Sequence, residues 1–239
     1  AETGGHAKEI VSKPSGADNK TRLMGIFISG NYSWDNIILG DVSIRFDGSS
    51  EFGSDSQWGS FWSVGGGINV HNLKFMKALP WLNQFKIRGT YGATGKVNYP
   101  PYAARDTYEV LFDDWYSTGV GATLQGIGNE KLVWEKTNTT NIGFDLSFFQ
   151  SKYSLTFSWY NRQTVDMITD VTIPSSAGFT SYKDNMGETR NRGYEISLSA
   201  TILNTKDFGV NAFINFARNE GRLMKISESL KAYNERVDD

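Results

Sequence analysis

The clearest pattern in the chain occupies residues 140–159, which read TNIGFDLSFFQSKYSLTFSW. From Ile142 to Phe148 every second residue is apolar, and the residues between them are Gly, Asp and Ser. The alternation resumes at Tyr153 and continues to Trp159, after a short polar turn at 150–152. Strict alternation indicates a strand with one apolar and one polar face. This stretch therefore predicts two antiparallel strands joined by a tight turn.

The same alternation recurs on both sides of this hairpin. It is present in six further runs, at 24–32, 38–47, 62–70, 85–91, 194–202 and 208–216. A content of 14% aromatic residues, 25 Gly and only 5 Pro suits a chain that is rich in strands and tight turns. We therefore predict an all-β fold of about eight antiparallel, up-and-down strands.

The connections between these runs alternate between short and long. Short polar turns are expected at 34–36, 150–152 and 204–207, and a longer connection is expected at 71–83, with a helical turn before Pro80. Long segments occupy 48–57, 92–132 and 169–191. In an up-and-down sheet the short turns fall at one end and the long loops at the other, which is typical of outer-membrane β-barrels. A loop of about forty residues argues against a compact soluble domain.

The two faces of the predicted strands differ in chemistry. The apolar faces carry no charged residue in these registers, and a charge near the bilayer midplane costs a barrel roughly 2–4 kcal/mol on its lipid face. The polar faces hold mainly Ser, Thr, Asn and Gly, and aromatic residues gather near the strand ends, as in the interfacial girdles of membrane proteins. The pattern favours a transmembrane β-barrel. A soluble β-rich carbohydrate-binding module, whose aromatic loops would hold the ligand, is the alternative.

Composition excludes several kinds of function. A net charge of −2 gives no electrostatic basis for binding nucleic acid. With no Cys and only 2 His, thiolate chemistry and multi-histidine metal centres are excluded, and no apolar run is long enough for a transmembrane helix. Glu135 and Asp145 would lie roughly 33 Å apart on one strand, far beyond the separation in a glycosidase. We expect no enzymatic activity, no metal and no cofactor.

Several longer motifs stand along the chain. They are RFDGSSEFG at 45–53, WGSFWSV at 58–64, WLNQFKIR at 81–88, YGATG at 91–95, GNEKLVWEKT at 128–137, PSSAGF at 174–179 and NMGETRNRGYE at 185–195. In this order they resemble the barrel of the SusC/RagA-type TonB-dependent outer-membrane transporters of Bacteroidetes. The resemblance covers roughly residues 21–221. Val133 stands where the family often has Lys and Glu130 where it often has Pro, and neither departure bears on the substrate.

The resemblance implies a 22-stranded barrel in the outer membrane of a Gram-negative cell, with an N-terminal plug, a TonB box and a SusD-like surface lipoprotein as its lid. Such a transporter imports an oligosaccharide or a peptide, with energy from a TonB complex that acts through the plug region. The plug and the TonB box have no counterpart in this sequence. We therefore expect a fragment: an arc of barrel strands at 21–222, in contact with outer-membrane lipids, between polar loop remnants at 1–20 and 223–239.

The candidate substrate-binding residues are aromatic and lie in the longest predicted loop. They are Tyr99, Tyr102, Tyr108, Trp115 and Tyr116. Aromatic faces stack on sugar rings and on peptide side chains. The alternative is that these rings pack the loop onto its neighbours.

Two groups of charged residues are further candidates. The carboxylates of Asp106, Glu109, Asp113 and Asp114 offer the oxygen ligands that calcium prefers, but their spacing matches no EF-hand and indicates a solvated acidic surface. At the rim of the barrel, Arg190 and Arg192 are expected to pair with Glu188, which would contribute under about 1 kcal/mol.

Overall fold

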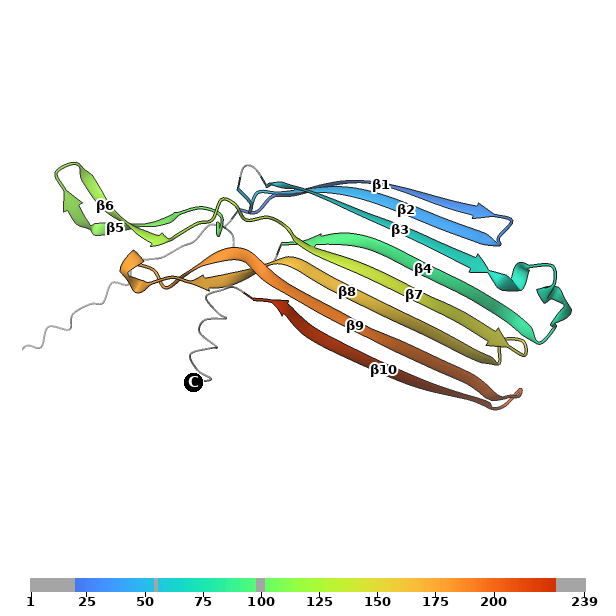
Figure 1. Cartoon of the computed structure of the whole chain (residues 1–239). Helices are drawn as coiled ribbons and strands as arrows, with labels where there is room; N and C mark the ends of the chain where they lie inside the picture. Colours follow the sequence, from blue (N-terminus) through green and yellow to red (C-terminus); the bar gives the residue numbers. More distant parts are fainter. Residues whose placement is uncertain (1–19, 54–55, 98–101, 227–239) are drawn as a thin grey trace, which may run out of the picture.

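The computed structural model describes residues 20–53, 56–97 and 102–226. Most of this part of the chain is one antiparallel sheet of eight strands in the order β1-β2-β3-β4-β7-β8-β9-β10. The strands are β1 (Leu23–Trp34), β2 (Ile38–Ser49), β3 (Trp58–Asn69), β4 (Leu82–Lys96), β7 (Glu135–Phe148), β8 (Tyr153–Thr172), β9 (Ser181–Asn204) and β10 (Gly209–Lys225). Each strand pairs with the next one along the sheet, so the topology is up-and-down, as the sequence predicted (Figure 1).

A separate two-stranded hairpin is inserted between β4 and β7. It consists of β5 (Thr107–Tyr116) and β6 (Gly119–Gly126) and extends beyond the long-loop end of the main sheet (Figure 1). The other elements are three short 3-10 turns, η1 (Val70–Asn72), η2 (Met76–Ala78) and η3 (Ser175–Ala177). No helix in the described ranges is long and apolar enough to cross a membrane.

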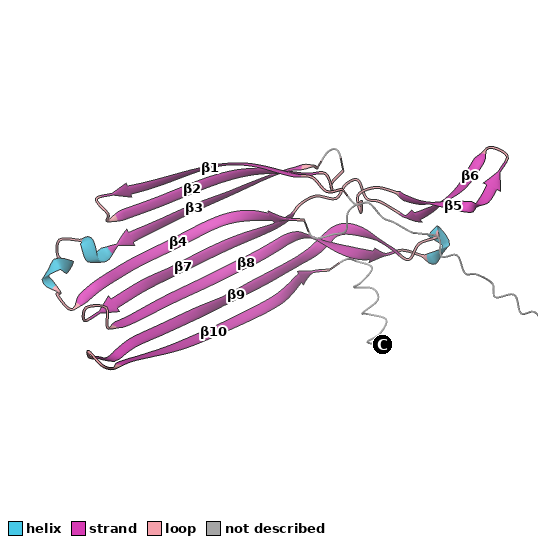
Figure 2. Ribbon diagram, turned by 180° about the vertical axis from the view of Figure 1, so that it is seen from behind, coloured by secondary structure: helices cyan, strands magenta, loops and turns pink. Residues whose placement is uncertain are grey.

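The short turns lie together at the opposite end of the sheet (Figure 2). Asp35 and Asn36 join β1 to β2 with positive φ angles of 49° and 51°, which is the geometry of a type I′ hairpin turn. The connection from β7 to β8 also has positive φ angles, of 52° at Phe149, 59° at Gln150 and 61° at Ser151. These turns match the strand twist and thereby fix the register of both hairpins.

The register keeps apolar residues opposite one another across the whole sheet. One cross-strand row consists of Trp34, Ile38, Ile68, Ile87, Phe144, Phe157, Ile196 and Phe216. The adjacent row, on the other face, consists of Ser33, Leu39, Gly67, Arg88, Gly143, Ser158, Glu195 and Ala217. Directly opposed residues of paired strands point to the same side of a sheet. The sheet therefore has one continuous apolar face and one polar face.

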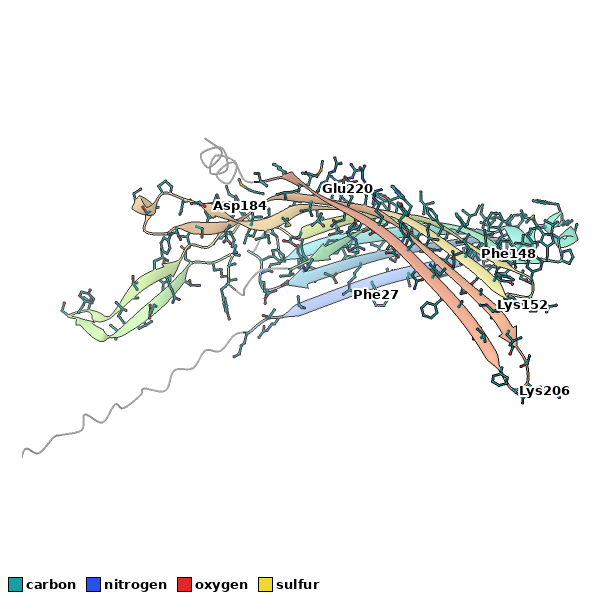
Figure 3. All side chains as sticks on the ribbon, turned by 90° about the horizontal axis from the view of Figure 1, so that it is seen from below. Phe27, Phe148, Lys152, Asp184, Lys206 and Glu220 are labelled. Atoms are coloured by element: carbon teal, nitrogen blue, oxygen red, sulfur yellow. The ribbon has the colours of Figure 1, made fainter. Side chains whose placement is uncertain are left out.

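No second layer covers the apolar face within the described residues. Ile28 is 75% exposed, Ile214 is 65% exposed and Phe216 is 54% exposed. Figure 3 shows the sheet as a single bent layer. An exposed apolar area of this extent is typical of a surface that binds a membrane or another protein. The expectation of an open barrel arc is confirmed, and the two-layered sandwich expected of a soluble module is not what the chain forms.

The apolar band runs obliquely across the strands. In the row Gly30, Val42, Val64, Tyr91, Thr140, Asn161, Arg192 and Glu220, the residues change from apolar on β2 and β3 to charged on β9 and β10. A row of this kind is perpendicular to the strands, whereas barrel strands are tilted by roughly 35–45° from the barrel axis. The membrane plane therefore crosses the tilted strands obliquely, which accounts for the oblique border of the apolar band.

Two expectations about the long segments were wrong. The segment 92–132 contains the β5–β6 hairpin, and most of 169–191 is strand, because β8 continues to Thr172 and β9 begins at Ser181. The first part of β9, residues 181–191, is mostly polar on both faces, and register shifts at 164–168 interrupt the alternation of β8, so hydrophobic periodicity is weak there. β5 and β6 do alternate, as at Val120, Ala122 and Leu124, but they are only 10 and 8 residues long and lie within the segment that was predicted to be a loop. The helical turn expected before Pro80 is present as η1 and η2.

Candidate functional site

The long loops fold over the polar face and enclose a small apolar cluster there. This cluster, called the rim core here, consists of Phe52, Phe61, Ala104, Leu132 and Trp134, all buried. Phe52 stacks on Trp134 with ring centroids 4.7 Å apart, and Phe61 meets Trp134 edge-on at 5.6 Å. The rim core draws residues from three loops (β2–β3, β4–β5 and β6–β7) and from β3, so it fixes these loops to the barrel wall.

Two glycines make room for the rim core. The ring of Phe61, on the polar face of β3, lies across Gly95 of β4, where any Cβ would overlap it. A Cβ at Gly59 would come within 2.6 Å of Phe61 and 3.2 Å of Trp134. Glycine is required at these positions because an aromatic ring occupies the space of a side chain.

Asn185 connects the loop after β6 to the β8–β9 hairpin. Its Nδ2 donates to the carbonyl of Val133 at 2.9 Å and to that of Asp166 at 2.6 Å, and its Oδ1 accepts the Val133 N–H at 2.9 Å. Asp166 has a φ of 55° and lies at a register shift in β8. The amide therefore satisfies backbone groups that an irregular strand leaves without ladder partners.

Glu135 and Asn129 add to this connection. Glu135 is 3% exposed, and its Oε1 accepts the Ile168 N–H at 2.8 Å, next to the same irregularity in β8. Asn129 donates from Nδ2 to the Lys183 carbonyl at 3.0 Å. Asn129, Glu135, Asp184 and Asn185 are together called the rim clamp here. Three of them lie in the motifs GNEKLVWEKT and NMGETRNRGYE, so these motifs connect the loop after β6 to the β8–β9 hairpin.

Asp184 is the acceptor at the centre of the rim clamp. Its Oδ1 accepts from Asn129 Nδ2 at 3.2 Å and from the Asn185 N–H at 2.8 Å, and its Oδ2 accepts from the Tyr182 hydroxyl at 3.4 Å. Burial, followed by the Asp184 charge, raises the pKa of Tyr182 above its ordinary value. The phenol therefore stays protonated at neutral pH and remains a donor.

Two adjoining clefts open beside the rim core. The larger, of about 560 Å³, is lined by Gly53, Ala104, Arg105, Asp106, Gly128 and Glu130. The second, of about 220 Å³, is lined by Lys20, Arg22, Ser50, Glu51, Tyr102 and Arg105. Arg105 lines both, so the clefts meet at this residue. They carry cationic and anionic groups together with one aromatic ring, which suits a polar ligand that can both stack and form hydrogen bonds.

The predicted aromatic residues do not form one cluster. Tyr102 is 39% exposed and lines the smaller cleft. Tyr108 and Tyr116 lie on β5, 63% and 67% exposed. Trp115 is also on β5, opposite Val120, and Tyr99 lies outside the described residues. Among the predicted aromatic side chains that the structure describes, Tyr102 lines one of these two clefts.

Arg105 was not among the sequence candidates. A single Arg in a polar loop gives no periodic or motif signal, and only the folded loop shows that it is shared by both clefts. The acidic loop residue Asp106 accepts the Gly128 N–H at 2.8 Å, so its carboxylate closes a loop. Among the described residues, no group of three or more His, Asp and Glu could hold a metal ion.

The predicted rim ion pair has different partners. Arg192 donates to Glu220 of β10 from Nη2 at 2.9 Å and from Nε at 3.1 Å, and Arg222 donates to the same carboxylate. Glu188 instead accepts from Gln163 at 2.6 Å, and Arg190 donates to Asn161 at 2.8 Å. The expected pairing with Glu188 was wrong because neighbouring strands bring other partners directly opposite these arginines.

The polar face below the loops is lined by side chains that lie flat on the wall. The guanidinium of Arg88 lies over Gly143 and donates to Ser158 at 2.7 Å and to Asp145 at 3.2 Å. The carboxylate of Asp41 lies over Gly65 in the same manner. Because glycines lie opposite these long side chains, the side chains can lie along the sheet and do not project far into the barrel interior.

The chain is similar to known receptor proteins over nearly its whole length. The family model described as TonB dependent receptor-like, beta-barrel, matches residues 4–238. The TonB-dependent receptor P39 of Formosa agariphila is 30% identical over 228 residues, which is 95% of this chain and 22% of that protein. The TonB-dependent receptor SusC of Bacteroides thetaiotaomicron is 32% identical over 218 residues, which is 87% of this chain and 21% of that protein.

Solved structures agree with these relatives. A structure of the RagAB peptide transporter matches with a TM-score of 0.80 and 32% identity, over 87% of this chain and 23% of that one. The siderophore receptor PirA of Pseudomonas aeruginosa matches with a TM-score of 0.55 and 12% identity over 85% of this chain and 35% of that one, which is a likeness of fold alone. The chain thus spans about a fifth of the length of the curated relatives it matches.

Proposed function

Since this chain belongs to the family of TonB-dependent receptor β-barrels, we propose that it forms part of the wall and extracellular mouth of a transporter that imports a nutrient. The chain is an outer-membrane protein of the SusC-like branch of the family. The observation that carries the proposal is the single sheet with an exposed apolar face and a polar face on which the loops fold.

This arrangement assigns a role to each part of the chain. The apolar face lies against lipid, the polar face lines the interior, and the rim core and rim clamp hold the loops at the extracellular mouth. Strands β1 and β10 each have one unpaired edge in the described sheet. Because an exposed edge is avoided in folded proteins, we propose that the remaining barrel strands pair there and close the wall.

The cargo that we propose is an oligosaccharide or a peptide, taken up together with a SusD-like lipoprotein and with energy supplied through TonB. The relatives named SusC and RagAB support this class of transporter. The clefts that meet at Arg105 support a polar cargo, because they present charged groups and the ring of Tyr102 to the mouth. Tyr99, Tyr108, Trp115 and Tyr116 are kept as further contacts in this proposal.

Single-cysteine labelling of the complete transporter in its outer membrane tests the orientation. This segment contributes no cysteine of its own. Phe157→Cys, on the apolar face, is expected to resist a water-soluble maleimide and to be quenched by a lipid-borne quencher. Thr156→Cys, the next residue on the polar face, is expected to show the opposite behaviour. Tyr116→Cys is expected to react in intact cells. Equal labelling of positions 156 and 157 by the water-soluble reagent would contradict the proposal.

Growth experiments test the cargo separately. A strain that lacks the transporter gene is grown with purified oligosaccharides or with peptides as the limiting nutrient. We expect a growth defect on one of these classes, restored by the complete gene. Normal growth on both, together with the labelling pattern above, would leave the barrel in place and reject an essential role in importing these nutrients.

A further inference from the structure

Four arginines of β9 and β10 follow Tyr194 and Phe216 toward the long-loop end, on the apolar face of the sheet. They are Arg190, Arg192, Arg218 and Arg222, and they are called the arginine belt here. Arg218 lies directly opposite Tyr194, and Arg222 lies opposite Arg190. Tyr194 in turn lies opposite Trp159 of the apolar face. The four side chains therefore point to the lipid side of the wall and not to its interior.

The arginine belt begins where the apolar band ends. Tyr194 and Phe216 form a ring pair with centroids 5.9 Å apart, and Arg218 follows Phe216 on the same face of β10. An aromatic pair that is followed by cations marks the level at which acyl chains give way to headgroups. Figure 3 shows Glu220 between Asp184, at the long-loop end, and Lys152 and Lys206, at the short-turn end.

The charges of the belt are only partly neutralised. Glu220 is held between Arg192 and Arg222, and Glu188 bonds to Gln163. Arg190 makes one hydrogen bond among the described residues, from Nε to Oδ1 of the neutral Asn161. Arg218 is exposed and has no hydrogen-bond or ion-pair partner among the described residues. A guanidinium offers five donors in a planar fork, so most donors of Arg190 and Arg218 point toward the surroundings.

We propose that the arginine belt binds the phosphate groups of glycolipids in the outer leaflet of the outer membrane. Arginine matches phosphate bidentately and is the side chain best suited to this contact. Glu220 holds Arg192 and Arg222 in place, while Arg218 and Arg190 make the free contacts. The inference rests on the proposed orientation of the apolar face toward lipid.

The matched control lies on the same strands. Arg162 of β8 is paired with Asn191, next to Arg190 and Arg192, but it belongs to the polar face, because Thr139 lies opposite it on β7. It has the same charge and the same height on the wall. A phosphate site on the lipid side would therefore be unaffected by its removal.

The test uses the complete transporter in phosphatidylcholine nanodiscs that contain lipid A, with dephosphorylated lipid A as the comparison probe. Lipid retained by the protein is counted by native mass spectrometry. We expect the wild type to retain phosphorylated lipid A preferentially. Each basic residue near a membrane surface contributes about five-fold in binding, so Arg190→Gln with Arg218→Gln is expected to reduce lipid retention by roughly 25-fold. Arg162→Gln is expected to retain the wild-type amount.

Two further arms make the result decisive. The pair of Arg→Lys changes at positions 190 and 218 keeps the charges and is expected to retain most of the lipid, which separates lost charge from lost folding. Folding of each variant is checked by the heat-dependent mobility of the barrel on gels. A folded Gln variant that retains as much phosphorylated lipid as the wild type would overturn the arginine belt alone, whereas failure of all forms to insert would overturn the proposed function.

Discussion

The side chain of Asn185 binds both backbone groups of Val133, a residue 52 positions earlier in the chain. Nδ2 donates to the carbonyl and Oδ1 accepts the N–H, each at 2.9 Å. This pair of bonds continues the pattern of a β-ladder with a side chain in place of a strand. It connects the loop that follows the β5–β6 hairpin to the irregular part of β8–β9. The contact thereby holds this loop in place at the mouth of the barrel.

Loss of this contact should release the loop without unfolding the sheet. For Asn185→Ala we expect a cost of about 1–3 kcal/mol, because buried backbone groups lose their partners. The measurement is hydrogen exchange at the Val133 amide in the complete protein, together with the rate of limited proteolysis between residues 97 and 134. Both should rise several-fold. Asn219→Ala, an exposed position on β10, is the control and should change neither; unchanged exchange in Asn185→Ala would reject the clamp.

The space over Gly95 is the second testable feature. Gly95→Ala should destabilise the barrel by about 1–3 kcal/mol, because the ring of Phe61 already fills the site. Thermal unfolding in detergent, followed by gel mobility, measures the change. Gly40→Ala, where an added Cβ meets nothing within 4 Å, serves as the control. Replacing Phe61 by Ala in the Gly95→Ala variant should cost less than the two single changes added together, and strict additivity would count against the overlap.

The opposite character of the two faces predicts opposite responses to the same substitution at adjacent residues. Ile196→Lys places a charge on the apolar face and should cost roughly 2–4 kcal/mol of the free energy of unfolding in a bilayer. Ser197→Lys places it on the polar face and should cost much less. The fraction of protein that refolds into lipid vesicles, measured over a urea series, gives both values. A similar loss at the two positions would show that the faces are misassigned.

Tyr102 offers a test of the cleft. If its ring stacks on cargo, Tyr102→Ala should weaken cargo binding to the complete transporter by roughly two- to ten-fold, the range for an aromatic contact. Tyr102→Phe should retain most of the affinity, since the ring remains. Tyr153→Ala, at the short-turn end of β8, is the comparison. Isothermal titration with the transported oligosaccharide or peptide gives the affinities, and an unaltered affinity in Tyr102→Ala would remove this residue from the site.

Much of the fold follows from the sequence alone. Alternation at Ile142–Phe148 and Tyr153–Trp159 identifies strands wherever one side faces an apolar medium, because the side-chain period of a strand is two residues. The chemistry of the two faces and the unequal connections then identify a membrane barrel. The same reasoning missed the extensions of β8 and β9 toward the long loops, since residues 181–191 of β9 are mostly polar on both faces and register shifts interrupt the alternation of β8. It also missed β5 and β6, which alternate but are short and lie within a segment predicted to be a loop.

The contacts at the mouth of the barrel depend on tertiary structure. The motifs around Asn129 and Asn185 stood out in the sequence, but their hydrogen bonds join segments more than fifty residues apart, and single-sequence patterns hold no information about such pairings. The position of Arg105 between two clefts and the partnership of Arg192 with Glu220 arise in the same way. Local periodicity fixes which side of a strand is apolar; strand register and loop packing decide which polar side chains meet.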